Sequence, residues 1–135
     1  MKVVIAFPPF LEAKGFATLG QNRQFQWFHN PSFIYPMIPA SAATLLKNEG
    51  FEAIWKDSIA EGESYEDFER FLQKEDPDIV AIETKTPVIK QHWEMIERIK
   101  DISSSDIKIA LMGDHVTALP LESMEYSRVD YVLTG

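Results

Sequence analysis

The residues most suited to chemistry form the turn Gly113-Asp114-His115-Val116-Thr117, which follows a short apolar segment. This turn combines a glycine, which permits close approach to the backbone, with a carboxylate, an imidazole and a hydroxyl. In open α/β folds, ligands bind at the carboxyl ends of parallel strands, and the turn is expected at such an end. Two further turns of this kind follow residues 3–7 and 79–83. Three loops that converge on one sheet edge predict a ligand platform.

The three loops offer an apolar wall and a few hydroxyl groups, which is the composition of a site for a large, flat, amphipathic ligand. The residues concerned are Pro8, Pro9, Phe10, Thr84, Thr86 and Thr117. A second interpretation stays open for Thr86, because Thr86 and Pro87 also fit the N-cap and first turn of a helix.

Two phosphate chemistries common in such folds do not fit the first of these loops. Pro8 and Pro9 supply no backbone N–H groups, which a nucleotide or flavin phosphate requires after the first strand. A phosphoryl-accepting receiver domain needs an acidic pair at that position and an aspartate after the third strand, where the chain has Glu83 followed by Thr84.

A metal site also lacks support in the sequence. The three histidines, His29, His92 and His115, are far apart, and the chain has no cysteine. We expect His29 in a loop and His92 on an exposed helix face beside the buried Trp93. His115 differs from them because it lies in a turn at the predicted ligand edge, where capping or hydrogen bonding is its commoner role.

Charge and composition exclude several classes of partner. The chain has 135 residues, a net charge of −8 and 45% hydrophobic residues, as expected for one globular domain. An excess of acidic residues argues against nucleic acid and against an anionic membrane surface. No apolar run approaches the length of a membrane span, and residues 1–2 lead directly into a strand rather than a signal peptide. We therefore expect a cytoplasmic protein.

Strands and helices alternate along the chain. Apolar runs predict strands over residues 3–7, 51–57, 78–83, 107–112 and 129–133. Helices are predicted over 40–49, after the capping box of Ser64 and Asp67, after Thr86, and over 120–126. This alternation predicts an α/β fold of three layers, with a Rossmann-like or flavodoxin-like, doubly wound, mostly parallel five-stranded sheet in the order 2-1-3-4-5.

The segment of residues 10–38 has no clear periodicity and is rich in aromatic residues, among them Phe25, Trp27 and Phe28. Insertions of this length in a small domain are usually functional or part of an interface. Two interpretations stay open for the insert: the core of an additional subdomain, or a docking surface.

Several stretches, taken in order, resemble a known family. They are KVVIAFPPF (2–10), YP (35–36), AATLL (42–46), EG (49–50), PDIVAIETKTP (77–87), GDHVTALP (113–120) and VDYVLTG (129–135). This set resembles the N-terminal cobalamin (vitamin B-12)-binding domain of radical S-adenosylmethionine enzymes, with a break only in the aromatic insert. The resemblance implies a cobalamin-binding module of a methyltransferase or cyclase type of enzyme, which is not catalytic by itself.

In that family the loops after strands one, three, four and five contact the corrin and its nucleotide tail. The residues that the resemblance implies as contacts are Pro8, Pro9, Phe10, Glu83, Thr84, Thr86, Gly113, Asp114, His115, Val116, Thr117, Thr134 and Gly135. The family continues into a barrel that binds S-adenosylmethionine and a 4Fe-4S cluster through a three-cysteine motif. We therefore expect this chain to be a fragment of a longer protein, with that barrel as its partner.

The sequence departs from the family pattern in two places. Met112, Gly113 and Asp114 stand where the family usually has two glycines and a proline, and the Asp-x-His-x-x-Gly motif of cobalamin mutases is absent. Cobalamin is therefore expected to bind without a protein histidine on cobalt. Met112, Asp114 and the aromatic insert favour an alternative, a cofactor-free scaffold or interaction domain. A stand-alone enzyme has the least support, because no nucleophile–base pair or paired carboxylates are evident.

Overall fold

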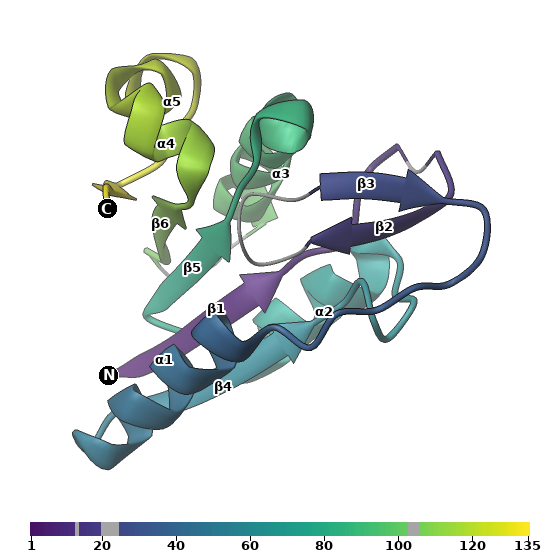
Figure 1. Cartoon of the computed structure of the whole chain (residues 1–135). Coiled ribbons are helices and arrows are strands. Elements are labelled where there is room, and N and C mark those ends of the chain that lie inside the picture. Colours follow the sequence, from purple (N-terminus) through teal and green to yellow (C-terminus); the bar gives the residue numbers. More distant parts are fainter. Residues whose placement is uncertain (13, 20–24, 103–105) are drawn as a thin grey trace.

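The chain forms a five-stranded, all-parallel sheet, seen in a computed structural model that describes residues 1–12, 14–19, 25–102 and 106–135 (Figure 1). Its strands are β1 (Lys2–Phe7), β4 (Glu52–Asp57), β5 (Ile79–Glu83), β6 (Lys108–Met112) and β7 (Tyr131–Leu133). They lie in the order β4-β1-β5-β6-β7. This confirms the predicted Rossmann-like, flavodoxin-like order 2-1-3-4-5.

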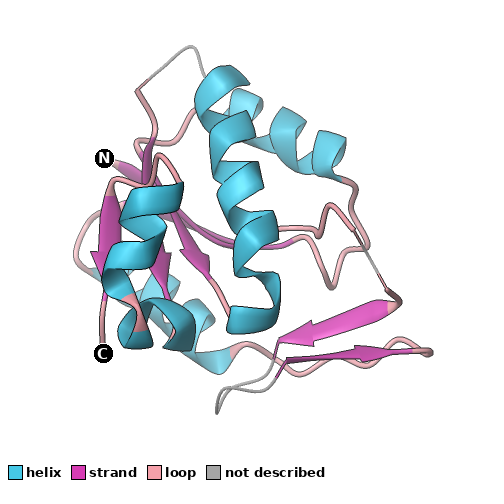
Figure 2. Ribbon diagram, turned by 90° about the horizontal axis from the view of Figure 1, so that it is seen from above, coloured by secondary structure: helices cyan, strands magenta, loops and turns pink. Residues whose placement is uncertain are grey.

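Helices connect the strands and cover both faces of the sheet (Figure 2). They are α1 (Met37–Asn48), α2 (Tyr65–Glu75), the 3₁₀ turn η1 (Thr86–Val88), α3 (Ile89–Ile102), α4 (Asp114–Ala118) and α5 (Pro120–Tyr126). Parallel strands require such crossover connections, which are right-handed as a rule.

The larger part of the core lies between the sheet and helices α2 and α3. Val4 of β1 and Val80 of β5 are fully buried there against Phe68, Leu72 and residues of α3. The opposite face packs a smaller set, in which Val3, Ile5 and the alanines of β5 and β6 meet α1. The strands therefore carry apolar residues on both faces, which explains their continuous apolar sequences.

Helix ends follow the sequence signals. Ser64 accepts a hydrogen bond from the backbone N–H of Asp67, whose carboxylate accepts one in return from the Ser64 backbone, so the predicted capping box is present. Asp76 ends α2 in the left-handed conformation, with φ 44°, directly before Pro77. Helix α1 begins at Met37 rather than at residue 40, which places Pro39 in its first turn.

The aromatic insert contains an antiparallel hairpin made of β2 (Phe16–Leu19) and β3 (Phe25–Phe28). Ala17 faces Trp27 across the two strands. The hairpin forms a separate two-stranded layer beside the carboxyl end of β1 (Figures 1 and 2). Ala17, Thr18 and Leu19 are buried, and because successive side chains of a strand alternate in direction, both faces of β2 are covered along this stretch.

Among the described residues, no helix has both the length and the apolar character needed to cross a lipid bilayer.

Candidate functional site

Three of the predicted loops meet at the carboxyl edge of the sheet. The Lys85 ammonium after β5 lies 3.5 Å from Oδ1 of Asp114, which follows β6. The hydroxyl of Thr117 donates to the carbonyl oxygen of Gly113 at 2.8 Å, and accepts from the N–H of Gly135 beyond β7 at 3.3 Å. The loops after β5, β6 and β7 therefore form one continuous surface.

Lys85 is the buried cation of this edge. Its side chain is 5% exposed, and its ammonium lies 2.9 Å from Oε1 of Glu83 in addition to the contact with Asp114. Two carboxylates around one ammonium leave an excess of one negative charge. Oδ1 of Asp114 is buried and has no hydrogen-bond partner among the described residues.

His115 connects η1 with α5 through its two ring nitrogens. Its Nδ1 lies 3.2 Å from the hydroxyl of Thr86, and its Nε2 lies 2.8 Å from Oε2 of Glu122 on α5. One neutral tautomer satisfies both contacts, with Nε2–H donating to the carboxylate and Nδ1 accepting from the hydroxyl. Lys85, not Thr86, is the N-cap residue of η1. The N-cap interpretation of Thr86 was therefore wrong, since its hydroxyl is directed to His115, whereas Pro87 does lie in the first turn.

Gly113 is required by the sheet itself. Its φ is +117°, and a Cβ added there would lie 2.3 Å from the carbonyl oxygen of Thr84. The Thr84 N–H donates to the carbonyl of Met112 at 2.8 Å, which extends the pairing of β5 with β6 by one residue. The close backbone approach expected at Gly113 is thus made by a neighbouring strand end of the same chain.

His92 lies inside the molecule, and its predicted exposed position was wrong. It is 1% exposed, its Nδ1 lies 2.8 Å from the hydroxyl of the fully buried Thr84, and its ring stacks on Phe10 at 5.8 Å. Its position three residues after Ile89 and four before Ile96 places it on the buried stripe of α3. Burial lowers the pKa of His92 to about 4, so the imidazole is neutral.

The loop after β1 lies against the hairpin and α3, where the Glu12 N–H donates to Oε1 of Gln91 at 2.9 Å. Pro8 and Pro9 are buried, and Phe10 contacts Trp27 at 5.2 Å and Phe25 at 5.6 Å. Phe10 therefore anchors the hairpin. The remaining predicted contact residues differ in exposure: Val116 is buried in the core, while Thr134 and Gly135 are exposed.

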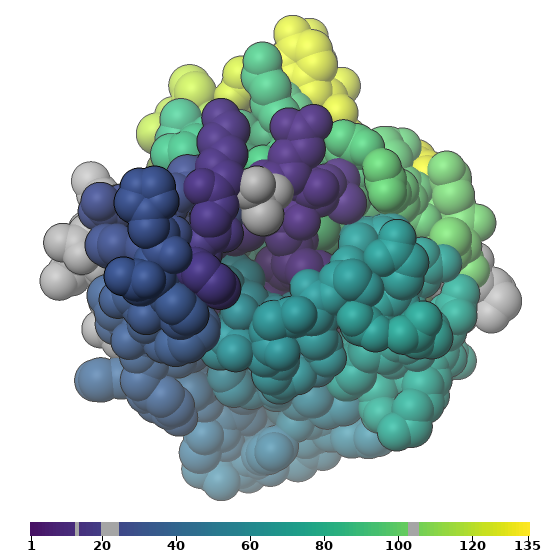
Figure 3. All heavy atoms as spheres, turned by 90° about the vertical axis from the view of Figure 1, so that its right-hand side faces the viewer, coloured from purple at the N-terminus to yellow at the C-terminus, as the bar shows by residue number. Residues whose placement is uncertain are grey.

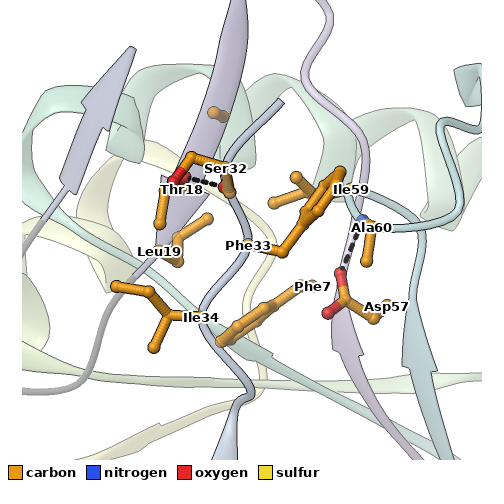
Figure 4. A pocket seen from close by; sticks show the side chains of 10 residues that line it. Phe7, Thr18, Leu19, Ser32, Phe33, Ile34, Asp57, Ile59 and Ala60 are labelled. Atoms are coloured by element: carbon orange, nitrogen blue, oxygen red, sulfur yellow. Dashed lines mark hydrogen bonds between the residues drawn. The ribbon is translucent and has the colours of Figure 1, made fainter. Parts of the chain in front are cut away.

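A small hollow of about 20 Å³ lies at the ends of β1 and β4 under the hairpin (Figure 4). Phe7 and Asp57 line it from the main sheet, and Phe33 and Ile34 from the segment after the hairpin. Burial raises the pKa of Asp57. The space is enough for about one water molecule.

Within the part of the chain that the structure describes, no group of three or more His, Asp or Glu side chains is arranged to hold a metal ion.

Sequence reasoning missed Lys85 and the role of His92. For His92 a signal existed, because its spacing from the apolar residues of α3 is that of a buried position. For Lys85 no comparable signal existed, since lysine after a strand is usually solvated.

Searches of protein-family models, of curated proteins and of solved structures found no match to this chain.

Proposed function

We propose that this chain is a cobalamin-binding module, with its seat on the edge formed by the loops after β5, β6 and β7. The observation that carries the proposal is the direct contact of these loops, through Lys85 with Asp114 and Thr117 with Gly135. The ordered sequence stretches that resemble the cobalamin domain of radical S-adenosylmethionine enzymes supply the identity of the ligand.

The residues present fit the chemistry of the group. The rim of a corrin carries amide side chains, and the partly exposed Asp114 carboxylate can accept hydrogen bonds from them. Thr86, Thr134 and Gly135 are exposed, and the two threonines add a pair of hydroxyl groups. Cobalamin, when bound, supplies a cobalt centre for methyl transfer or redox chemistry, and this chain holds its rim and tail. Pro8 and Pro9 take part only as buried support.

Retention of hydroxocobalamin tests the proposal. The purified protein is mixed with hydroxocobalamin, desalted, and examined by its visible spectrum, and a retained, altered spectrum is expected. Thr117→Val should weaken retention roughly tenfold, because it removes the hydroxyl that joins two loops of the seat. Thr44→Val is the matched control, since Thr44 makes the same bond to a carbonyl four residues earlier but lies on α1. An unchanged spectrum and no retention by the folded protein would reject the proposal.

The proposal includes a partner. In the full-length protein a radical S-adenosylmethionine barrel, with its 4Fe-4S cluster, would follow this module and hold the substrate. Exposed apolar residues beside the edge, Leu119 (52%) and Leu121 (77%), offer a surface for that barrel.

A second candidate is a cofactor-free interaction domain of the same fold. It is favoured by the internal pairing at the edge, where His115, Thr117 and Lys85 already have protein partners. The cobalamin experiment separates the two candidates, because a folded protein that retains no cobalamin is the result expected of this second one.

A further inference from the structure

A second hollow, separate from the proposed cobalamin seat, lies between the hairpin and the loop that follows β4. Its volume is about 170 Å³. Figure 3 shows this side of the molecule, with hairpin residues in purple and dark blue beside the blue-green and teal segment after β4. Four aromatic side chains contribute to its walls and two polar side chains to its floor: Phe10, Phe16, Trp27, Phe33, Ser58 and Glu63.

The aromatic walls come from both strands of the hairpin and from its flanks. Phe10 and Trp27 pack edge to face at 5.2 Å and are half-buried, so their positions are fixed. Phe16 and Phe33 are 45% and 57% exposed, which is unusual for phenylalanine and leaves their rings open to a ligand. Aromatic faces carry negative partial charge and attract cations.

Two polar side chains of the floor face each other. Ser58 is fully buried, and a hydrogen bond between its side chain and the Glu63 carboxylate contributes to the lowered pKa of Glu63. Buried polar groups are normally paired in this way.

The charge of the floor is negative. Oε1 of Glu63 accepts from the ammonium of Lys56 at 2.6 Å, and Glu61 accepts from the same ammonium. Lys56 thus faces two carboxylates, and it also lies 5.1 Å from the ring centre of Phe71, on the side of α2. Burial acts to raise the pKa of Glu63, but the hydrogen bonds with Lys56 and Ser58 and the positive charge of Lys56 together outweigh it and lower the pKa, so the carboxylate is ionised at neutral pH.

We infer that this hollow binds a small organic cation with a methylated ammonium head group, held between the aromatic walls and attracted by the negative charge of the Glu63 carboxylate. A methylated ammonium is apolar in shape and positive in charge, which matches both the walls and the floor. The inference stands independently of cobalamin, because the seat proposed for that cofactor lies on the other strands.

Other classes of ligand match less well. An anion would meet the excess carboxylate of the floor and a chain of net charge −8. A divalent metal ion requires several oxygen ligands, and aromatic walls provide none. A neutral apolar molecule would gain nothing from the negative charge of the floor.

Titration with choline and with 3,3-dimethyl-1-butanol, its neutral isostere, tests the inference. The probes are followed through the amide and Trp27 indole N–H signals in nuclear magnetic resonance spectra. Choline is expected to bind with a Kd of about 1 mM or below, and the neutral isostere at least about tenfold more weakly, because only the cation gains from the carboxylate and the ring faces.

Variants locate the site. Glu63→Gln should weaken choline binding about tenfold and leave binding of the isostere unaffected. Glu61→Gln is the control, because Glu61 also pairs with Lys56 but does not line the hollow. That variant should change the affinity for choline less than about twofold. Trp27→Leu should weaken choline about fivefold, and Trp27→Phe should retain most of the affinity. Neither glutamine variant is expected to alter cobalamin retention.

Each outcome decides the question. Selective binding of choline that is lost in Glu63→Gln supports the inference. Equal binding of the two probes by the folded protein would show an apolar hollow and overturn it, as would shifts that map away from the hairpin. No binding of either probe at concentrations well above about 10 mM would mean that the hollow holds water only, which also overturns it.

Discussion

At the scale of single residues, His92 is a titratable group enclosed by the core. Its pKa in the folded protein is about 4, against an ordinary value of 6.5, because burial disfavours the charged ring. The unfolded chain therefore binds a proton at a higher pH than the folded protein does. Above pH 6.5 the ring is neutral in both states and does not affect the free energy of unfolding. As the pH falls from 6.5 towards 4, the unfolded chain gains a proton that the folded protein does not, so the free energy of unfolding decreases.

This sign gives a measurable pH dependence. Between pH 7 and pH 5, His92 should cost the folded protein about 2 kcal/mol, a loss measured by urea unfolding at each pH. His92→Phe keeps a ring against Phe10 and should lack this part of the pH dependence, while His29→Gln, in an exposed loop, should retain it. The same slope in His92→Phe as in the parent protein would contradict the assignment.

Because Gly113 has no side chain, the ends of β5 and β6 can approach each other closely. In Gly113→Ala the new Cβ would clash with the Thr84 carbonyl oxygen and the residue would keep a φ of +117°, so we expect a loss of roughly 3 kcal/mol in unfolding free energy. Gly62→Ala is the matched control: its φ is also positive, at +66°, but nothing lies within 4 Å of the added Cβ. That variant should lose only about 1 kcal/mol. Equal losses in the two variants would show that the clash is relieved at no cost.

At the scale of elements, the best-predicted boundaries are those with a local chemical cause. The start of α2 follows from Ser64 and Asp67, and its end from Pro77. The strand β1 follows from an uninterrupted apolar run that is buried on both faces. Such signals act over a few residues, so the sequence contains them completely.

The cap of α2 can be tested directly. Ser64→Ala removes the side chain that accepts from the Asp67 N–H, and we expect a loss of about 1 kcal/mol in unfolding free energy. Ser64→Asp, which can accept the same hydrogen bond, should recover most of it. Denaturant unfolding measures both, and a Ser64→Ala protein as stable as its parent would mean that solvent replaces the cap.

The hairpin could not be predicted in detail, for a physical reason. Its strands have four residues each, and the contacts that hold it, such as Phe10 with Trp27 and the Thr18 hydroxyl with the Ser32 carbonyl, join separate parts of the insert. Neither a hydrophobic period nor a two-residue turn marks it. Ala17 and Leu19 are buried whereas Phe16 is half exposed, so part of the insert is packed, and the docking surface stays a prediction.

At the scale of the whole molecule, the strand order was predictable because alternating strands and helices permit few topologies. That order alone determines that the loops after β5, β6 and β7 are neighbours. It does not determine which side chains pair across them. Lys85 between Glu83 and Asp114, and His115 between Thr86 and Glu122, depend on side-chain directions that only the packed molecule specifies.

The last strand of the sheet, β7, is held by the carboxylate of Asp130, the residue directly before it. Asp130 accepts from the ammonium of Lys100 at 2.6 Å and from the backbone N–H of Ile109 at 2.7 Å, and its other oxygen lies 3.6 Å from Lys108. It therefore joins α3, β6 and the start of β7. Burial acts to raise the pKa of Asp130, but the hydrogen bonds from Lys100 and the Ile109 N–H and the positive charges of Lys100 and Lys108 together outweigh it, so the pKa is lowered.

Replacing this carboxylate should release β7 before the rest of the sheet. We expect Asp130→Ala to lower the unfolding free energy by roughly 2 kcal/mol, because Lys100 and the Ile109 N–H lose an acceptor. Amides of β7 should then exchange with solvent faster than those of β1, since β7 pairs only with β6 and opens locally. For the parent protein, the carboxylate's contribution is present above the unfolded pKa near 3.8 and is lost as the pH falls through the lower folded value. Uniform acceleration of exchange in β1 and β7 would show that the sheet opens only as a unit, and that Asp130 acts on global stability alone.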